Sequence, residues 1–152
     1  MTDDIIAMRK QRGELATAQQ RRAADPARSV WVEASAGTGK TKVLSDRVLR
    51  LLLNGVPPGR ILCLTYTKAA AVEMSSRIAG RLSRWAVADD ETLHKELSAL
   101  LGNLPDSREA YIKLEATARQ LFAVLLDTPG GMKIQTIHRF CRFPPMLPPR
   151  RI

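Results

Sequence analysis

Residues 34–41 read ASAGTGKT, and this stretch constrains the fold more than any other part of the chain. It follows an apolar run at residues 28–34 (RSVWVEA) that predicts a buried strand, and it precedes a segment with helical spacing. A loop ending Gly-Lys-Thr between a strand and a helix predicts a phosphate-binding loop, whose backbone N–H groups hold phosphate oxygens. Lys40 would reach the β- and γ-phosphates, and the Thr41 hydroxyl would hold Mg²⁺. The pattern usually begins with Gly, where this chain has Ala34, and the simpler alternative is a helix N-terminus with flexible glycines.

The rest of the chain predicts an α/β fold with parallel strands. Strands are expected at residues 29–33, 60–65 and 132–136, and helices at 17–24, 40–54, 68–85, 91–101 and 107–126. Thr67 is placed to cap the helix that follows it, and Asp106 is placed to cap the last helix. Cys63 lies in an apolar run and is expected in the core. This order of elements is the start of a parallel α/β domain, whose ligand should lie at the carboxyl ends of the strands.

The charge is strongly basic and unevenly distributed. The chain carries 24 Lys and Arg against 15 Asp and Glu, a net charge of +9. Residues 89–130 hold eight acidic and four basic side chains, whereas residues 131–152 hold five basic and no acidic ones. This balance favours a polyanionic partner, nucleic acid before membrane. The alternative is a generally basic, solvated surface.

Cysteines and hydropathy point to a reducing setting without a membrane. Cys63 and Cys141 are the only cysteines, and they form neither a metal-binding spacing nor a disulfide framework. The N-terminus, MTDDIIAMRKQRGE, is too polar for a signal peptide, and no apolar run approaches the roughly 18 residues of a membrane span. We therefore expect a cytoplasmic protein.

Four segments, in order along the chain, resemble superfamily 1 DNA helicases of the UvrD/RecB type. They are Gln20-Arg21-Arg22-Ala23, the stretch ASAGTGKT, LTYTKAAAVEMSSRI at residues 64–78, and TIHRFC at residues 136–141. The first is similar to the family's adenine-reading glutamine motif, and the last two are similar to its motifs Ia and Ib. In this family Ala commonly stands at the position of Ala34. The long helical spacer and the phrase TPGGMKIQTIH resemble the AddA-type helicase–nuclease subunit of double-strand-break repair.

The resemblance covers roughly residues 15–141 and implies a domain organisation. It predicts a partial P-loop, RecA-like parallel sheet domain with an inserted helical segment. The expected parts are a loose N-terminal segment (1–14), the start of the ATP-binding domain 1A (15–87), a 1B-like helical insertion (88–128), a return to 1A with motif Ib (129–141) and an irregular Pro/Arg-rich tail (142–152).

The resemblance also implies a nucleotide site for ATP and Mg²⁺. Gln20 would hydrogen-bond the adenine edge, although the spacing Thr17-x-x-Gln20 also fits a capping box in which Gln20 bonds backbone. The triphosphate and Mg²⁺ would be held by the loop, with Lys40 and Thr41 in the catalytic roles. The loop residues are Ala34, Ser35, Ala36, Gly37, Thr38, Gly39, Lys40 and Thr41.

A DNA path is implied by the other two motifs. Its expected residues are Thr65, Tyr66, Thr67, Lys68, Thr136 and His138. The Tyr66 ring can stack on a base, which contributes about 1–3 kcal/mol, and Lys68 can neutralise a phosphate. The alternatives are core packing for Tyr66 and an ordinary polar role for His138.

A small P-loop GTPase is a rival class, because residues 123–130 (AVLLDTPG) mimic an apolar strand ending in Asp-x-x-Gly. Against it, Asn54 and Asn103 are the only asparagines, so no Asn-Lys-x-Asp guanine motif exists. The apolar run also continues a helical pattern. Residues 85–91 (WAVADDE) mimic a strand in the same way, but their acids are better suited to a helix start.

Parts of a helicase motor have no counterpart in this sequence. We find no strand ending Asp-Glu, no second RecA-like domain with arginine fingers, whose loss costs roughly 10³–10⁵ in rate, and no nuclease domain. Residues 142–145 (RFPP) stand where the family continues an apolar helix. We therefore expect a truncated piece of an AddA-like ATP-dependent DNA helicase, inactive alone and marginally folded because its sheet edges are open. A full-length parent would pair with an AddB-like subunit. The competing expectation is a non-catalytic nucleotide- and DNA-binding fragment.

Overall fold

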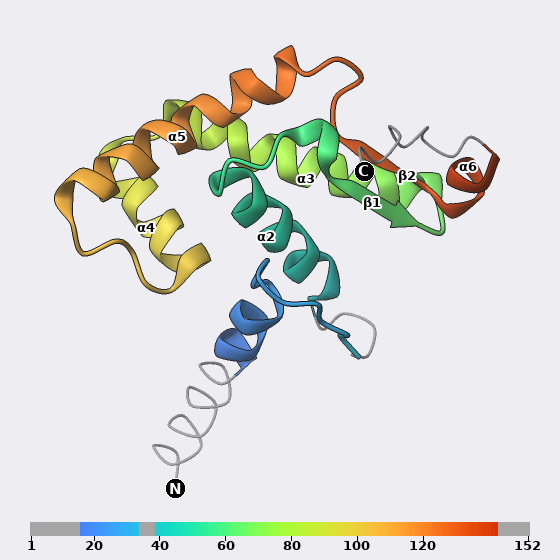
Figure 1. The fold of residues 1–152 in the computed structure, drawn as a ribbon, viewed down its shortest axis with the longest axis horizontal. Helices are drawn as coiled ribbons and strands as arrows, with labels where there is room; N and C mark the ends of the chain where they lie inside the picture. Colours follow the sequence, from blue (N-terminus) through green and yellow to red (C-terminus); the bar gives the residue numbers. More distant parts are fainter. Residues whose placement is uncertain (1–15, 34–38, 143–152) are drawn as a thin grey trace, which may run out of the picture.

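The computed structural model describes residues 16–33 and 39–142 (Figure 1). The expected loose segment at residues 1–14, the loop residues 34–38 and most of the Pro/Arg-rich tail lie outside the described residues.

The N-terminal part is a helix followed by an extended segment. Residues 16–23 are helical, as expected, and the helix stops before Asp25-Pro26. Arg47 ties the next residues to the body of the protein, because its Nη1 and Nη2 donate to the carbonyls of Asp25 and Arg28, each over 2.6 Å.

The strand that we predicted at residues 29–33 does not form. The described residues of this run have no strand pairing, and the Trp31 side chain is 91% exposed. A strand is held by hydrogen bonds to a neighbour, and the only sheet among the described residues joins two strands from elsewhere in the chain. The apolar residues of this run are therefore not sufficient to make it a buried strand.

The sheet has two parallel strands, β1 (Leu62–Thr65) and β2 (Lys133–Thr136). A short 3₁₀ helix, η1 (Pro58–Arg60), leads into β1. The register pairs Leu62 with Lys133 and Thr65 with Thr136, so both strands end side by side. β1 is less buried than its apolar sequence suggests, because Leu62 is 40% exposed and Cys63, which we expected in the core, is half-buried against it.

Five described helices after the loop complete the fold. They are α2 (Lys40–Leu53), α3 (Lys68–Val87), α4 (Asp90–Leu101), α5 (Arg108–Asp127) and α6 (Ile137–Arg142). The α3 cap is confirmed, since Thr67 Oγ1 accepts a 3.1 Å hydrogen bond from the Ala70 N–H. The cap predicted for α5 is wrong: Ser107 takes the N-cap position instead of Asp106, and no side chain caps this helix.

The two strand-like decoys are helical. Residues 123–127 belong to α5, and residues 85–87 are the last of α3. Asp89 then caps α4, accepting from the Thr92 N–H over 2.7 Å. This bond lowers the pKa of the Asp89 carboxyl. The helical form of α5 removes the strand that a small GTPase would need.

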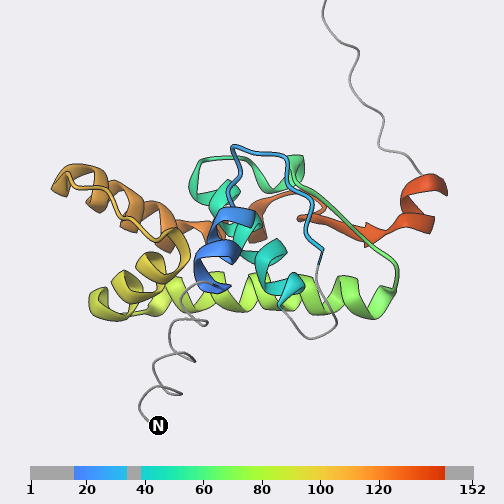
Figure 2. The same ribbon diagram turned by 90° about the horizontal axis from the view of Figure 1, so that it is seen from below.

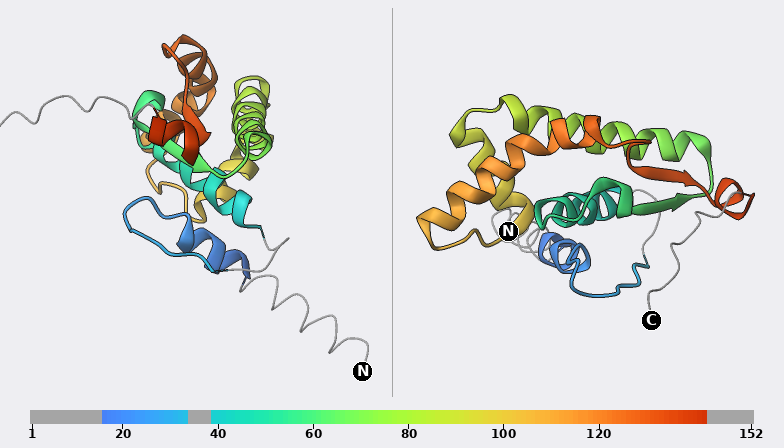
Figure 3. Two further views of the ribbon diagram at one scale, coloured as in Figure 1. Left: turned by 90° about the vertical axis from the view of Figure 1, so that its right-hand side faces the viewer. Right: turned by 45° about the horizontal axis from the view of Figure 1, so that its top comes forward.

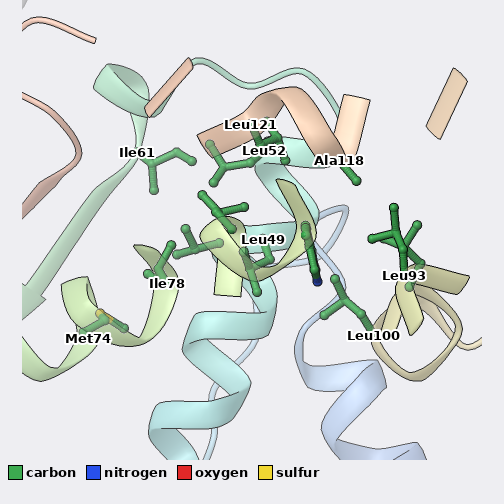
Figure 4. Packing of buried hydrophobic residues seen from close by; sticks show 13 residues of the cluster. Leu49, Leu52, Ile61, Met74, Ile78, Leu93, Leu100, Ala118 and Leu121 are labelled. Carbon is green, nitrogen blue, oxygen red and sulfur yellow. The ribbon is translucent and has the colours of Figure 1, made fainter. Parts of the chain in front are cut away.

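The core is mainly helical (Figure 4). Leu49 of α2, Ile78 of α3, Leu97 of α4 and Leu121 of α5 come from four helices into one cluster, which also encloses the fully buried Trp85. Burying one such Leu or Ile side chain contributes about 1.5–3 kcal/mol. The hydrophobic effect therefore holds these helices together with little help from the sheet.

The sheet and α4 lie at opposite ends of the molecule. Figure 2 shows α3 running along the whole molecule, and Figure 3 shows α5 beside it with the sheet at the far end from α4. Among the described helices, none is long and apolar enough to cross a membrane. The sequence-predicted ligand residues that the structure describes lie toward the sheet end, at the start of α2 or, for Gln20, in the N-terminal helix beside it.

Candidate nucleotide and nucleic-acid sites

The start of α2 is shaped to receive an anion. Gly39 precedes the helix with a φ of 88°, a left-handed conformation that residues with a Cβ rarely adopt. The first turn carries no acidic residue, and no side chain caps it. Lys40 and Thr41 open the helix, where backbone N–H groups and the helix dipole favour negative charge. This chemistry fits a phosphate group with its Mg²⁺. The predicted loop residues Ala34 to Thr38 lie outside the described residues.

Gln20 lies against this helix start. A Cβ built on Gly39 would sit 3.1 Å from the Gln20 amide nitrogen, so the two residues are in close contact. Gln20 and Lys40 also line one pocket of about 360 Å³. Its other walls come from the N-terminal helix and from residues 30–33. The structure thus brings together two predicted nucleotide residues that are far apart in sequence.

The second predicted site lies where β1 and β2 end. Because Thr65 pairs with Thr136, the segments that follow both strands leave the sheet at the same edge (Figure 1). A groove of about 970 Å³ opens there between the start of α3 and α6. It is lined by Lys68, Thr136, Ile137, His138, Arg139, Cys141 and Arg142. Three of the predicted DNA residues therefore share one groove.

The groove is basic. Lys68, Arg139 and Arg142 are its cationic side chains, all three are exposed, and no acidic residue is among those that line it. Such a surface attracts a phosphate backbone. The sequence motifs did not single out Arg139 or Arg142; the signal for them was the run of five basic and no acidic side chains in residues 131–152.

Hydroxyl groups shape both loops beside the groove. Thr65 Oγ1 donates to the Thr67 carbonyl over 3.0 Å, and Thr136 Oγ1 accepts from the Arg139 N–H over 3.3 Å. Tyr66 lies in the first of these loops and is 82% exposed, so it is not packed in the core. It is not among the residues that line the groove. Its ring is nevertheless accessible to solvent, two residues before Lys68 in the chain.

Two other features limit the chemistry of the described part of the chain. Its residues contain no group of three or more His, Cys, Asp or Glu side chains suited to a metal ion, which leaves Thr41 as the described candidate ligand. Burial raises the pKa of the Cys63 thiol, which favours the neutral thiol over the nucleophilic thiolate.

Comparison with known proteins gives a consistent family. The UvrD/REP helicase N-terminal domain matches residues 15–144. The RecBCD enzyme subunit RecB of Chlamydia pneumoniae is 35% identical over 118 residues, which are 74% of this chain and 10% of that protein. The AddA subunit of the ATP-dependent helicase/nuclease of Ligilactobacillus salivarius is 34% identical over 124 residues, 82% of this chain and 8% of that protein.

A shorter segment is more similar to a third relative. The AddA subunit of the ATP-dependent helicase/nuclease of Lactobacillus gasseri is 49% identical over 59 residues, 39% of this chain and 5% of that protein. The chain thus spans a tenth or less of the length of these relatives. No solved structure is significantly similar to it.

Proposed function

The chain belongs to the UvrD/REP helicase N-terminal domain family, and from this premise we propose that it binds ATP with Mg²⁺ at the start of α2 and single-stranded DNA in the groove beside β1 and β2. The observation that carries the proposal is the register of the sheet. By pairing Thr65 with Thr136, it places the segments that resemble motifs Ia and Ib on two sides of one basic groove.

In the nucleotide site each residue has a distinct role. The N-terminus of α2 and Lys40 hold the β- and γ-phosphates, and Thr41 contributes its hydroxyl to Mg²⁺. The metal ion neutralises charge on the phosphates when it is bound. Gln20 selects adenine through its amide, and its place in the same pocket as Lys40 supports its assignment to the nucleotide site.

In the groove, charge provides affinity and the aromatic ring provides stacking. Lys68, Arg139 and Arg142 neutralise phosphates, while Thr136 and His138 contact the sugar–phosphate backbone. Tyr66 stacks on an unpaired base, which favours single-stranded over double-stranded DNA. For a full-length parent chain we also propose helicase activity and an AddB-like partner subunit, which the likeness to the AddA proteins supports.

Two substitutions test the two sites separately. We expect Lys40→Ala to weaken ATP binding about tenfold or more while DNA binding is kept, because a charge beside the phosphates is lost. We expect Lys68→Ala to weaken DNA binding and to reduce the slope of log affinity against log salt by about one, while ATP binding is kept. Equilibrium titrations with labelled nucleotide and labelled oligonucleotide measure both.

The matched control is Lys95→Ala. Lys95 is an exposed lysine on α4 that pairs with Glu91 in the same helix over 2.6 Å, so its loss should change neither affinity. The proposal fails for the nucleotide site if Lys40→Ala binds ATP like the unaltered chain. It fails for the groove if Lys68→Ala and Lys95→Ala show the same salt slope.

A further inference from the structure

An ion pair with a buried carboxylate joins the helix that starts at the nucleotide site to the helix that starts at the groove. Asp46 of α2 is 6% exposed. Its Oδ1 accepts from Arg81 Nη1 of α3 over 2.6 Å, and its Oδ2 accepts from Lys42 Nζ over 2.6 Å. Both oxygens of this carboxylate are therefore engaged, one within α2 and one across to α3.

Arg81 extends the connection to α4. Its Nε lies 3.4 Å from Glu96 Oε2, which also accepts a 2.6 Å hydrogen bond from the indole N–H of the buried Trp85. The Arg81 guanidinium carbon lies 5.7 Å from the Trp85 ring centroid, within cation–π range. We refer to Asp46, Arg81 and Glu96 as the Asp46–Arg81–Glu96 network.

The network lies on a direct route between the two sites. Lys42 is next to Thr41 in the first turn of α2, and Asp46 follows about 9 Å along the helix from Lys40. α3 begins at Lys68 and continues without a break past Arg81, about 20 Å further on. Because a continuous helix moves as a unit, a shift of α2 transmitted at Arg81 also moves the end that carries Lys68.

The Asp46–Arg81 contact is better suited to positioning α2 relative to α3 than to stabilising the fold. A buried ion pair is often no more stabilising than apolar side chains of the same volume, because both charges lose their hydration. Apolar packing, such as that around Leu49 and Ile78, holds α2 and α3 together. The 2.6 Å charged hydrogen bond adds a directional contact between one atom of each helix, which apolar contacts do not provide.

We propose that Asp46 and Arg81 are positioning residues that couple nucleotide binding at the start of α2 to DNA binding at the start of α3. This inference rests on the proposed function, since it requires both ligands. Nucleotide binding shifts the first turn of α2, the Asp46–Arg81 contact passes the shift to α3, and Lys68 moves relative to α6 across the groove. By thermodynamic linkage, DNA must then change the affinity for nucleotide by the same factor.

The test measures the coupling itself. The dissociation constant of the 152-residue chain for a labelled single-stranded oligothymidylate is determined with and without a saturating, non-hydrolysable ATP analogue and Mg²⁺. We expect the two values to differ about fivefold or more, the lower end of common allosteric couplings. In the double variant Asp46→Leu/Arg81→Met we expect a ratio near one, with each separate affinity changed less than about twofold.

This variant is chosen so that a folding defect cannot imitate the result. Apolar replacement of both partners of a buried ion pair is often neutral for stability. In this variant Glu96 keeps its contacts with Trp85 and Arg84, and Lys42 is half exposed to solvent. A thermal melt measures the stability. Asp46→Asn serves as the second variant if the double variant melts early, because Asn keeps an acceptor for Arg81 but loses the charge. We expect its coupling ratio to fall between those of the unaltered chain and the double variant.

The control is Arg77→Met, one turn before Arg81 on the same helix. Arg77 pairs with Glu73 of α3 over 2.8 Å, so its loss should leave the coupling ratio unchanged. Full coupling in both Asp46 variants would overturn the inference, as would independent binding of the two ligands in the unaltered chain. If the unaltered chain binds neither the ATP analogue nor the oligonucleotide, the proposed function itself is wrong and the inference falls with it.

Discussion

Gly39 is the residue where backbone conformation and the candidate nucleotide site meet. Its φ of 88° is one that a residue with a Cβ adopts only under strain, and the Cβ would also lie 3.1 Å from the Gln20 amide nitrogen. The same glycine thus sets the direction of the chain into α2 and leaves room for Gln20. A side chain here would disturb both.

We predict that Gly39→Ala weakens ATP binding and lowers the free energy of unfolding by about 1–3 kcal/mol, the usual cost of a strained backbone conformation. Gly55→Ala is the control, because Gly55 has a φ of +81° but no atom within 4 Å of its would-be Cβ. It should show the stability loss without the loss of ATP affinity. Denaturant unfolding and nucleotide titration of both variants separate the two effects, and equal ATP affinity in both would contradict the role given to the Gly39–Gln20 contact.

At the scale of single elements, α3 contains a glycine that lowers the stability of the helix. Gly80 lies in the interior of this helix, and a Cβ there would meet no atom within 4 Å. Glycine in a helix is less favourable than alanine by about 0.8–1.0 kcal/mol. The residue therefore costs stability with no packing requirement in the described structure.

We predict that Gly80→Ala raises the free energy of unfolding by about 0.5–1 kcal/mol. Chemical denaturation measures the change, with one dependence of the unfolding free energy on denaturant concentration fitted to all variants. Gly55→Ala is again the control and should lower the free energy of unfolding, since it makes the same substitution at a left-handed position. A loss of stability on Gly80→Ala would mean that this glycine packs against something in solution that the described residues do not show.

Elements were predictable to different degrees, for physical reasons. The helices could be predicted because their apolar positions recur over many residues, as Met74, Ile78, Leu82 and Trp85 do in α3. The strand expected at residues 29–33 could not be judged locally, because a strand depends on a neighbour that its own sequence does not encode. Asp106 and Ser107 are both good caps, and only the path of the chain decides between them.

The candidate sites were predictable where a motif carries them. Gln20, Lys40, Lys68 and His138 all lie in segments that resemble family motifs, and the structure places them in two pockets. For Arg139 and Arg142 the sequence offered only the basic run of residues 131–152, and the short helix after β2 places them on the same groove as Lys68. The nucleotide and DNA roles themselves stay predictions.

At the scale of the whole molecule, the described residues lack a carboxylate placed for ATP hydrolysis. Neither described strand ends in a carboxylate, since β1 ends at Thr65 and β2 at Thr136, and the acidic run at residues 89–91 lies at the start of α4. Hydrolysis needs a carboxylate to activate water and an arginine finger to stabilise the transition state. The loss of an arginine finger slows such hydrolysis by a factor of roughly 10³ or more.

We therefore predict that the purified 152-residue chain binds ATP without robust DNA-stimulated hydrolysis. Phosphate release with and without single-stranded DNA measures this, with Lys40→Ala as the background. Stimulation by DNA well above that background would show that these residues suffice for turnover. The marginal stability expected from the open sheet edges stays a prediction, and a sharp cooperative melt of the same sample would count against it.

The pairing of β1 with β2 also determines when the groove can form. Thr65 and Thr136 are neighbours in the sheet, yet three helices separate them along the chain. Contacts between residues so distant in sequence form slowly, because closing the intervening chain costs entropy before the contact is gained. During synthesis, α2 and α3 can pack while β2 has not yet left the ribosome, so we expect the groove beside β1 and β2 to be the last part of the described chain to be assembled.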